Sequence, residues 1–369
     1  MTHEIDLESG LGWALASRGR VAQALRVLLA SVARPGEILQ LSVADATTRT
    51  GESAESLVPI LHPSAVPGVK EQRILMQKAG ARLLLLGSTG YPTLLREISD
   101  PPAVLFGRGK DVPAGLAVAI VGSRRASRAG LDAARQIAGE LARAGVTIVS
   151  GFARGIDAAA HESALRAGGG TVAVLGCGVD VCYPAEQRRL FQELVEKGTV
   201  LSEFPMGEQP KPFHFPIRNR IIAGLAHLTL VVEAAERSGS LITARLAMEY
   251  GRDVAACPGA AMALSAAGSN SLLKDGAILV RNAADVLAEL PGALAAPTPR
   301  ERELTALLGD DERLVLGVLD PDDPRDADAL VAATGLDAGR LSAALVGLEL
   351  EGLAAALPGA VFVRRRGGA

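Results

Sequence analysis

Two short stretches of this chain combine glycine, small hydroxyl side chains and arginine, as phosphate-binding turns do. The first, Gly122-Ser123-Arg124, directly follows the apolar run Ala117–Val121, and a helical pattern begins near Arg128. A strand that ends in a turn and continues as a helix leaves backbone N–H groups free beside the positive end of the helix dipole. Arg124 adds a guanidinium, which binds phosphate through a fork of N–H groups. This stretch is therefore a candidate phosphate-binding turn, although Gly122-Ser123 alone could be a plain tight turn.

The second stretch, Ser150–Asp157, reads SGFARGID. Its Arg154 lies between two glycines, where the backbone can approach a ligand closely, and it is the second candidate cation. Asp157 is more typical of a capping residue at the start of a helix than of a catalytic acid. His161 shares its helix face, but a structural hydrogen bond explains this histidine better than a catalytic pair does.

Further polar residues follow the later apolar runs. Arg218 and Arg220 would point the same way from a strand but not from a helix. Glu233 could act as a base, or equally well as a cap of Ser238–Ser240. Phe152, Phe213 and Phe215 could stack on bases, although core packing is the default for phenylalanine. The full set of candidate contacts to an extended polyanion is Gly122, Ser123, Arg124, Ser127, Ser150, Gly151, Phe152, Arg154, Gly155, Arg218, Asn219, Arg220, Ser238, Gly239 and Ser240.

The elements that must position these residues alternate between strand and helix from about residue 80 to 290. The expected strands are Ala117–Val121, Thr147–Ser150, Val172–Leu175, Val200–Ser202, Leu228–Val232, Val254–Ala256 and Ile278–Val280. Strands that are apolar throughout and separated by helices indicate a mostly parallel sheet covered on both faces. The fold class is α/β, an extended Rossmann-like, doubly wound sheet. Ligands of such sheets bind outside the carboxyl ends of the strands, which is where the candidate residues lie.

Composition excludes several kinds of function. The 369 residues carry a net charge of −3, so a polyanion site must be a local basic cluster. Three cysteines form no disulfide framework, and Cys177 and Cys182 are better explained as buried free thiols. The P-loop, G-x-G-x-x-G, G-x-S-x-G and H-E-x-x-H motifs are missing. We expect binding without catalytic residues, metal or cofactor. No signal peptide or run of 18 apolar residues occurs, so we expect a cytoplasmic protein that does not bind membranes.

The sequence patterns at the two ends of the chain differ from the alternation of strands and helices in the middle. Residues 1–75 predict a small helical domain, SAM-like or a helix-hairpin-helix bending near Gly19-Arg20-Val21, although a plain bundle fits as well. Residues 80–290 form the core domain, and an Ala/Pro-rich linker covers 291–308. Three helices and a hairpin over 309–369 predict a winged-helix (DML1-like) domain. Its recognition helix carries Arg340 but also Glu349 and Glu351, so protein contact is at least as well supported as duplex binding, and Arg364-Arg365-Arg366 alone could grip a backbone.

Five segments in this order resemble the DprA (Smf) family of bacterial DNA-processing proteins: AIVGSRRAS, IVSGFARGIDAAAHESAL, RNRIIAGL, VVEAAERSGSLITARLAMEYGR and CPG…GSN. The resemblance covers about residues 83–282. It implies a single-stranded-DNA-binding protein of natural transformation that protects incoming strands and is not a nuclease. It also implies a homodimer that loads RecA onto strands covered by single-strand-binding protein, and a winged helix in some members.

The resemblance places DNA contacts on Arg124 and Arg154, with Ser123, Ser127, Gly151 and Gly155 positioning phosphates. We expect binding to weaken steeply with salt and to show little base preference. The apolar residues Ile221, Ile222 and Leu225 are candidates for a dimer interface. One rival function is a nucleotide phosphoribohydrolase with Glu233 as its catalytic carboxylate, against which stands the missing P-G-G-x-G-T run. Another is a RecA adaptor that acts without DNA.

Overall fold

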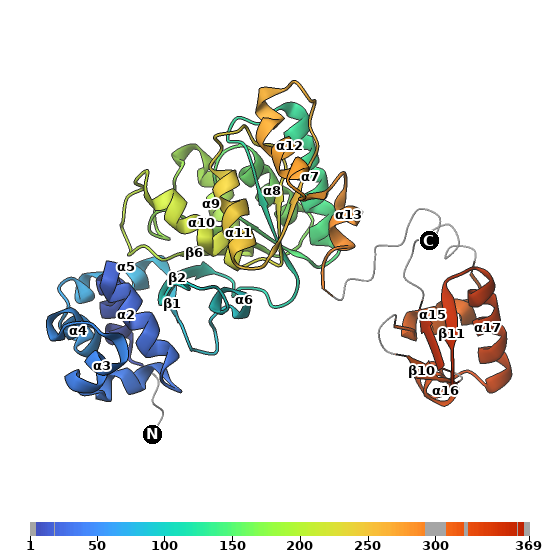
Figure 1. The fold of residues 1–369 in the computed structure, drawn as a ribbon, viewed down its shortest axis with the longest axis horizontal. Coiled ribbons are helices and arrows are strands. Elements are labelled where there is room, and N and C mark those ends of the chain that lie inside the picture. The colour runs from blue at the N-terminus through green and yellow to red at the C-terminus, as the bar shows by residue number, and fades with distance from the viewer. Residues whose placement is uncertain (1–4, 18, 292–307, 321–323, 360, 365–369) are drawn as a thin grey trace. The chain divides into compact units, whose positions relative to one another are not determined.

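The chain divides into two compact units, Met1–Ala283 and Ala284–Ala369. The computed structural model describes residues 5–17, 19–291, 308–320, 324–359 and 361–364 (Figure 1). Nearly all of the expected linker, 291–308, lies outside these residues, as do Arg365 and Arg366. The expected boundaries of three separate domains stay a prediction.

A nine-stranded sheet forms the middle of the first unit, in the order β1-β2-β6-β5-β4-β3-β7-β8-β9. Its strands are β1 (Ala81–Leu85), β2 (Val104–Gly109), β3 (Ala117–Val121), β4 (Thr147–Ser150), β5 (Thr171–Val174), β6 (Thr199–Ser202), β7 (Leu228–Val231), β8 (Asp253–Ala256) and β9 (Ile278–Leu279). The strands from β6 to β9 in this order pair in parallel, and β3 to β7 are buried along their whole length. The mostly parallel, doubly wound sheet predicted from the apolar runs is confirmed.

The sheet extends on one side by an antiparallel pair that the sequence pattern did not mark as strands. β1 pairs with β2, and β2 pairs with β6 through Phe106 opposite Ser202. The helix α6 (Thr93–Arg96) lies between β1 and β2 in the sequence. Because the connection from β1 to β2 holds only this short helix, the two strands run in opposite directions.

Helices cover both faces of the sheet, because the strand order reverses at β3. α7 packs on α8 and α8 on α9, whereas α10 packs on α11. The helices of the sheet region are α7 (Arg128–Arg143), α8 (Ile156–Arg166), α9 (Arg188–Lys197), α10 (His214–Gly224), α11 (Ser240–Glu249) and α12 (Ala267–Lys274). Reversal of the strand order with right-handed crossovers places the two groups on opposite faces.

Short helices precede the sheet, as expected, and share its hydrophobic core. They are α1 (Leu7–Ala16), α2 (Gly19–Ala30), α3 (Val43–Thr50), α4 (Ala54–Leu61) and α5 (Val69–Ala79). Trp13 is fully buried and donates from Nε1 to the Ile60 carbonyl at 2.8 Å. Gln72 exchanges two hydrogen bonds with the backbone of Met206, at 3.1 and 2.8 Å. The helical part is therefore anchored to the sheet region by polar as well as apolar contacts.

The boundary between the units falls at the start of α13 (Ala283–Leu287). The second unit then forms the predicted winged helix, whose three-stranded sheet has the order β10-β12-β11. Its elements are α15 (Asp310–Val318), β10 (Arg325–Asp326), α16 (Ala327–Thr334), α17 (Ala338–Leu350), β11 (Ala354–Leu357) and β12 (Val361–Arg364). Val315, Leu330 and Leu348 are fully buried in a core of its own.

No single helix among the described residues is long and apolar enough to cross a membrane; α16 and α17 meet that test only as a pair bent by 105°, on length and composition alone.

Candidate nucleic-acid interface

The candidate residues gather at the carboxyl ends of β3, β4 and β7. From β3 the chain proceeds to β4 on one side, and it later returns to place β7 on the other side. Such a reversal opens a crevice between the loops that follow the two strands. The loops that line it are 122–127 after β3, 151–155 after β4 and 232–239 after β7.

The turn after β3 is held by close backbone contacts. The Ser123 N–H donates to the Glu233 carbonyl at 2.7 Å, and the Ser123 hydroxyl accepts from the Arg125 N–H at 3.1 Å. A Cβ on Gly122 would lie 2.6 Å from the Ile156 side chain and 2.9 Å from the Glu233 carbonyl. Only glycine fits there, so the turn presents its backbone in one conformation.

Glu233 is the second residue of the loop after β7, and its carboxylate is buried. One of its oxygens accepts from the Ser127 N–H at 3.0 Å and the other from the Ser127 hydroxyl. Ser127 in turn caps α7 by accepting from the Gly130 N–H at 3.1 Å. Glu233 therefore orients the start of α7, and capping of Ser238–Ser240, the alternative expected from the sequence, is not its role.

The loop after β4 packs against this turn, backbone on backbone. Gly155 has φ 77°, and a Cβ there would lie 2.2 Å from the Ser123 carbonyl. Asp157 accepts from the N–H groups of Gly151 and Ala153 at 3.1 and 3.2 Å. Burial raises the pKa of Asp157, while Arg218 and these N–H groups act in the opposite direction. Asp157 thus shapes the loop from the first turn of α8, and the expectation that it is the N-cap of this helix is corrected, because Gly155 occupies the N-cap position.

Two expected contacts, Ser150 at the end of β4 and Phe152 in this loop, do not reach the surface. The Ser150 hydroxyl is buried and donates to the Ile120 carbonyl at 2.6 Å. Phe152 is 1% exposed and packs edge-on against Phe191, with ring centroids 5.8 Å apart. Because both side chains are enclosed by the sheet and its helices, they cannot touch a strand of nucleic acid.

His161, also on α8, has its Nδ1 2.8 Å from the Thr171 hydroxyl. Complete burial lowers the pKa of His161 to about 3, so its ring is neutral. As expected, it belongs to a structural hydrogen bond.

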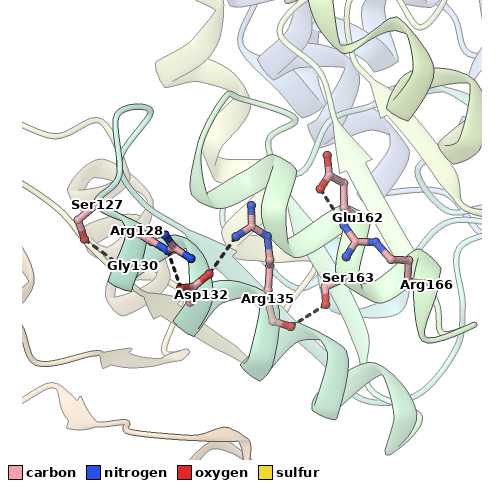
Figure 2. A network of polar contacts seen from close by, with 8 residues as sticks. All are labelled: Ser127, Arg128, Gly130, Asp132, Arg135, Glu162, Ser163 and Arg166. Carbon is pink, nitrogen blue, oxygen red and sulfur yellow. Dashed lines mark hydrogen bonds and ion pairs between the residues drawn. The ribbon is translucent and has the colours of Figure 1, made fainter.

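Contacts between α7 and α8 fix the register of the two turns (Figure 2). The Ser163 hydroxyl donates to the Arg135 carbonyl at 2.6 Å, and a Cβ on Gly139 would lie 2.9 Å from the same hydroxyl. Arg135 also binds Asp132 on its own helix at 3.1 Å. Close packing at Gly139 therefore holds α7 and α8 in one position along each other, and with them the turns that precede the two helices.

Arg124 and Arg154 both reach the surface and line one small recess, together with Ala153 and Tyr183. The guanidinium carbon of Arg124 lies 5.3 Å from the centroid of the Phe215 ring, a cation–π contact. Arg154 is 63% exposed and forms an ion pair with Glu186. The structure therefore brings together the two cations that the sequence singled out.

Beside this recess opens a larger cleft of about 570 Å³. Its walls include Gly122, Arg124, Phe215, Asn219, Ser238 and Ser240. The hydroxyls of Ser238 and Ser240 lie 2.7 Å apart at the start of α11. The cleft thus offers hydroxyls, a guanidinium and an aromatic ring to one ligand.

Arg218 and Arg220 of α10 point in different directions, because side chains two positions apart in a helix are separated by about 200° around its axis. Arg218 is buried under the cleft and donates to the carbonyls of Gly151, at 2.6 Å, and Val174. Burial lowers the pKa of Arg218 to about 10, opposed by Asp157 and assisted by Arg124. Arg220 pairs with Glu203 and with Asp100, so it does not line the cleft. The expectation that Arg220 contacts the ligand there is corrected.

The dimer residues inferred from the apolar character of α10 also need correction. Ile221, Ile222 and Leu225 are all buried in the core of their own chain. Apolar residues on a helix that covers a sheet face point inward, so these three offer no surface to a second copy. A dimer would use other residues.

The sequence pattern gave no signal for Tyr183 or Glu186, in the loop after β5. Tyr183 borders both the recess and the cleft and lies 5.8 Å from the Phe215 ring. Glu186 faces Arg154. Within the described part of the chain, no three histidine, cysteine or carboxylate side chains gather as metal ligands would.

Comparison with known proteins identifies relatives of both parts of the chain, the sheet region and the winged helix. Residues 82–291 match the family described as DNA recombination-mediator protein A, and residues 288–360 match the DprA winged helix domain. The chain is 36% identical over 332 residues to protein Smf of Synechocystis, covering 78% of this chain and 81% of that protein. It is 48% identical over 200 residues to DNA processing protein DprA of Streptococcus pneumoniae, covering 54% and 71%.

Two solved structures resemble this one. The X-ray structure of DprA from Streptococcus pneumoniae has a TM-score of 0.62 at 36% identity, covering 74% of this chain and 99% of that chain. DprA from Helicobacter pylori has a TM-score of 0.51 at 31% identity, covering 56% and 93%. With the family match spanning more than half of its residues, the chain belongs to the DprA (Smf) family of DNA recombination mediators.

Proposed function

We propose that this chain binds single-stranded DNA along the cleft and recess, and mediates recombination without cutting or modifying the strand. The observation that carries the proposal is the placement of Arg124 and Arg154, two exposed guanidiniums on one recess beside backbone-presenting turns. The Helicobacter pylori relative is described by its single-stranded-DNA binding mode. Phosphates would lie against the guanidiniums and the Ser123 turn, and a base would stack near Phe215.

The charge of the lining favours an anion. Arg124 forms no ion pair with any carboxylate of the described residues, and Arg218 adds positive potential from beneath the cleft. Asp157 opposes it from a fully buried position, bonded to backbone N–H groups. Two buried side chains of the cleft have the chemistry to read base edges, but both are already engaged: Arg218 donates to the carbonyls of Gly151 and Val174, and Asn219 to that of Gly239. Base preference is therefore expected to be slight.

Fluorescence anisotropy of the full chain with a labelled single strand of about 20 nucleotides tests this proposal. The affinity should fall steeply between about 50 and 200 mM salt, because each neutralised phosphate releases counterions. A duplex of the same length should bind more weakly, since its bases are stacked away from Phe215. Equal affinity for the duplex, or affinity independent of salt, would refute the proposal.

A phosphoribohydrolase on the same fold is the rival function. Its catalytic carboxylate would be Glu233, whose two oxygens are both engaged by Ser127. A carboxylate held in this way caps a helix and is not directed at a substrate. Incubation with nucleoside monophosphates should release no free base, and measurable release would favour the hydrolase over the binder.

We further propose that the chain acts in the cytoplasm as a homodimer in natural transformation, protects incoming strands and loads RecA onto them. Family membership supports this proposal. RecA-driven strand exchange on DNA covered by single-strand-binding protein should be faster with the chain present. An effect on RecA without any DNA binding would favour the adaptor alternative, and sedimentation at several concentrations measures the dimer.

A further inference from the structure

A second groove lies on the other side of the start of α10. Its volume is about 400 Å³, and it runs between α2 and the segment that joins β6 to α10. Residues 212–220, which are the end of this segment and the first turns of α10, alternate between the two hollows. Pro212, Phe215, Pro216 and Asn219 line the cleft, whereas Phe213, His214, Ile217 and Arg220 line the groove. The two hollows therefore lie on either side of the first turns of α10, and Pro212 of the cleft is followed directly in the chain by Phe213 of the groove.

Aromatic rings form one wall of this groove. Phe204 stacks on His214 with ring centroids 4.0 Å apart, and Phe213 meets His214 edge-on at 4.6 Å. Phe213 is 60% exposed, and Ile217 beside it is also exposed. A phenylalanine that remains open beside a hollow presents a flat face on which a base can stack.

The charges of the groove are largely neutralised, with one exception. Arg220 is paired with Glu203 and Asp100, and Lys211 with Glu208. Arg26, on α2, forms no ion pair or hydrogen bond with any described residue; Asp100 and Glu203 attract it only at longer range. Partial burial, with the charge of Arg220, lowers the pKa of Arg26. A partly buried guanidinium with unused N–H donors suits an anion of the phosphate type.

We propose that this groove binds a further nucleotide of the same single strand, with its base on Phe213 and its phosphate against Arg26. The inference rests on the proposed function, and it extends the path of the strand from the sheet edge onto the helical part of the chain. Three observations combine in it: the position of the groove next to the cleft, on the other side of the start of α10, an exposed aromatic face and an unpaired cation. An acidic peptide of a partner protein would use Arg26 but has less need of a flat ring.

Strand length separates this subsite from the main cleft. Anisotropy with a strand of about 6 nucleotides reports the cleft, and a strand of about 20 nucleotides can reach both hollows. Phe213→Ala and Arg26→Ala should each weaken binding of the long strand about fivefold to tenfold and leave that of the short strand unchanged, since a stacked base or a phosphate contact contributes on this scale. Phe213→Trp should restore the affinity for the long strand.

Matched controls are Val58→Ala, an exposed apolar residue of α4, and Lys78→Ala, an exposed cation in the last turn of α5. Both should bind both strands like the unaltered chain. Equal losses for short and long strands, no loss in either groove variant, or equal loss in the controls would overturn the inference while the proposed function stands. If the unaltered chain bound neither strand, the proposed function would fall and the inference with it.

Discussion

The two units of this chain each carry arginine near the start of a helix, but only one of them leaves the charge available. In the first unit, Arg124 precedes α7 and rests on the Phe215 ring, 5.3 Å from its centroid. In the winged helix, Arg340 lies in the first turn of α17 and donates from Nε and Nη2 to Asp311, at 2.9 and 2.6 Å. A guanidinium with one edge held by both oxygens of a carboxylate attracts phosphate weakly. Availability of the charge therefore distinguishes the units better than the number of arginines does.

The exposed face of α17 reinforces the difference. Val346 and Leu350 point outward, Leu350 with 82% of its surface exposed. The loops at the sheet edge instead expose Arg124, Arg125 and Arg154. Glu349 is exposed beside them. A helix face that combines apolar residues with a carboxylate suits contact with protein better than contact with a phosphate backbone. For the strand binding proposed above, the comparison favours the sheet edge over the winged helix.

Removing both cations of the recess should have the largest effect. The double variant Arg124→Ala, Arg154→Ala is expected to weaken single-strand binding about a hundredfold, because two charge-assisted phosphate contacts disappear. Its Tm should stay close to that of the unaltered chain, since both side chains are exposed. Anisotropy and thermal melting measure the two quantities.

Arg166→Ala is the matched control for this variant. Arg166 is exposed and paired with a glutamate, as Arg154 is, but it lies at the far end of α8 (Figure 2). Its loss should change the affinity less than about twofold. If the control and the double variant lost affinity equally, net charge and not the recess would be responsible.

Acid should destabilise the first unit through His161, which has no counterpart in the second unit because residues 284–369 contain no histidine. The folded ring stays neutral down to about pH 3, whereas the unfolded ring takes up a proton below about pH 6.5. The stability that depends on neutral His161 is therefore complete above that pH and falls as the pH falls. Between pH 6.5 and 5 the loss is about 2 kcal/mol.

Calorimetry of the full chain at several pH values measures this slope. His161→Asn should flatten it for the first unit, whatever the variant does to the absolute Tm, and should leave the second unit unchanged. An identical slope in the variant would show that other groups cause the acid sensitivity.

The fold could be predicted from the sequence where local pattern decides it. Apolar runs such as Ala117–Val121 mark buried parallel strands, because both faces of such strands lie under helices. β2 was not predicted, because Val104–Gly109 ends in Gly-Arg-Gly and pairs antiparallel with β6. The alternation of strands and helices, which marks the parallel strands, gives no signal for such a strand. Val104–Gly109 becomes a strand because it pairs with β6, which lies much further along the chain, at Thr199–Ser202.

The candidate site was predictable where one loop supplies both backbone and side chain, as at Gly122-Ser123-Arg124. It was not predictable where exposure depends on tertiary packing. Phe152 and Arg220 have the residue types of DNA contacts, yet the first fills the core and the second faces Glu203. Tyr183 borders the recess, and Glu186 pairs with Arg154, only because the loop after β5 folds toward them.

A smaller effect is expected from removing the carboxylate that pairs with Arg154 in the first unit. In the absence of DNA, Glu186 occupies Arg154 with a surface ion pair. Glu186→Gln removes the competing charge, so single-strand affinity should rise about twofold to threefold at low salt. The gain should vanish in Glu186→Gln, Arg154→Ala, because no cation is then released. A gain that persisted in this combination would mean that Glu186 repels DNA directly.

The smallest effect is expected in the winged helix, and it would break the comparison if it proved large. Arg340→Ala should leave single-strand and duplex affinities within about twofold of the unaltered chain, because Asp311 already neutralises that guanidinium. Asp311→Asn is the sharper companion, since it frees Arg340 without removing it. If freeing Arg340 creates duplex binding that Arg340→Ala, Asp311→Asn lacks, then one carboxylate is what keeps this winged helix from DNA. Loss of duplex binding in Arg340→Ala alone would instead show that the neutralised arginine already reads DNA, and availability of charge would no longer separate the two units.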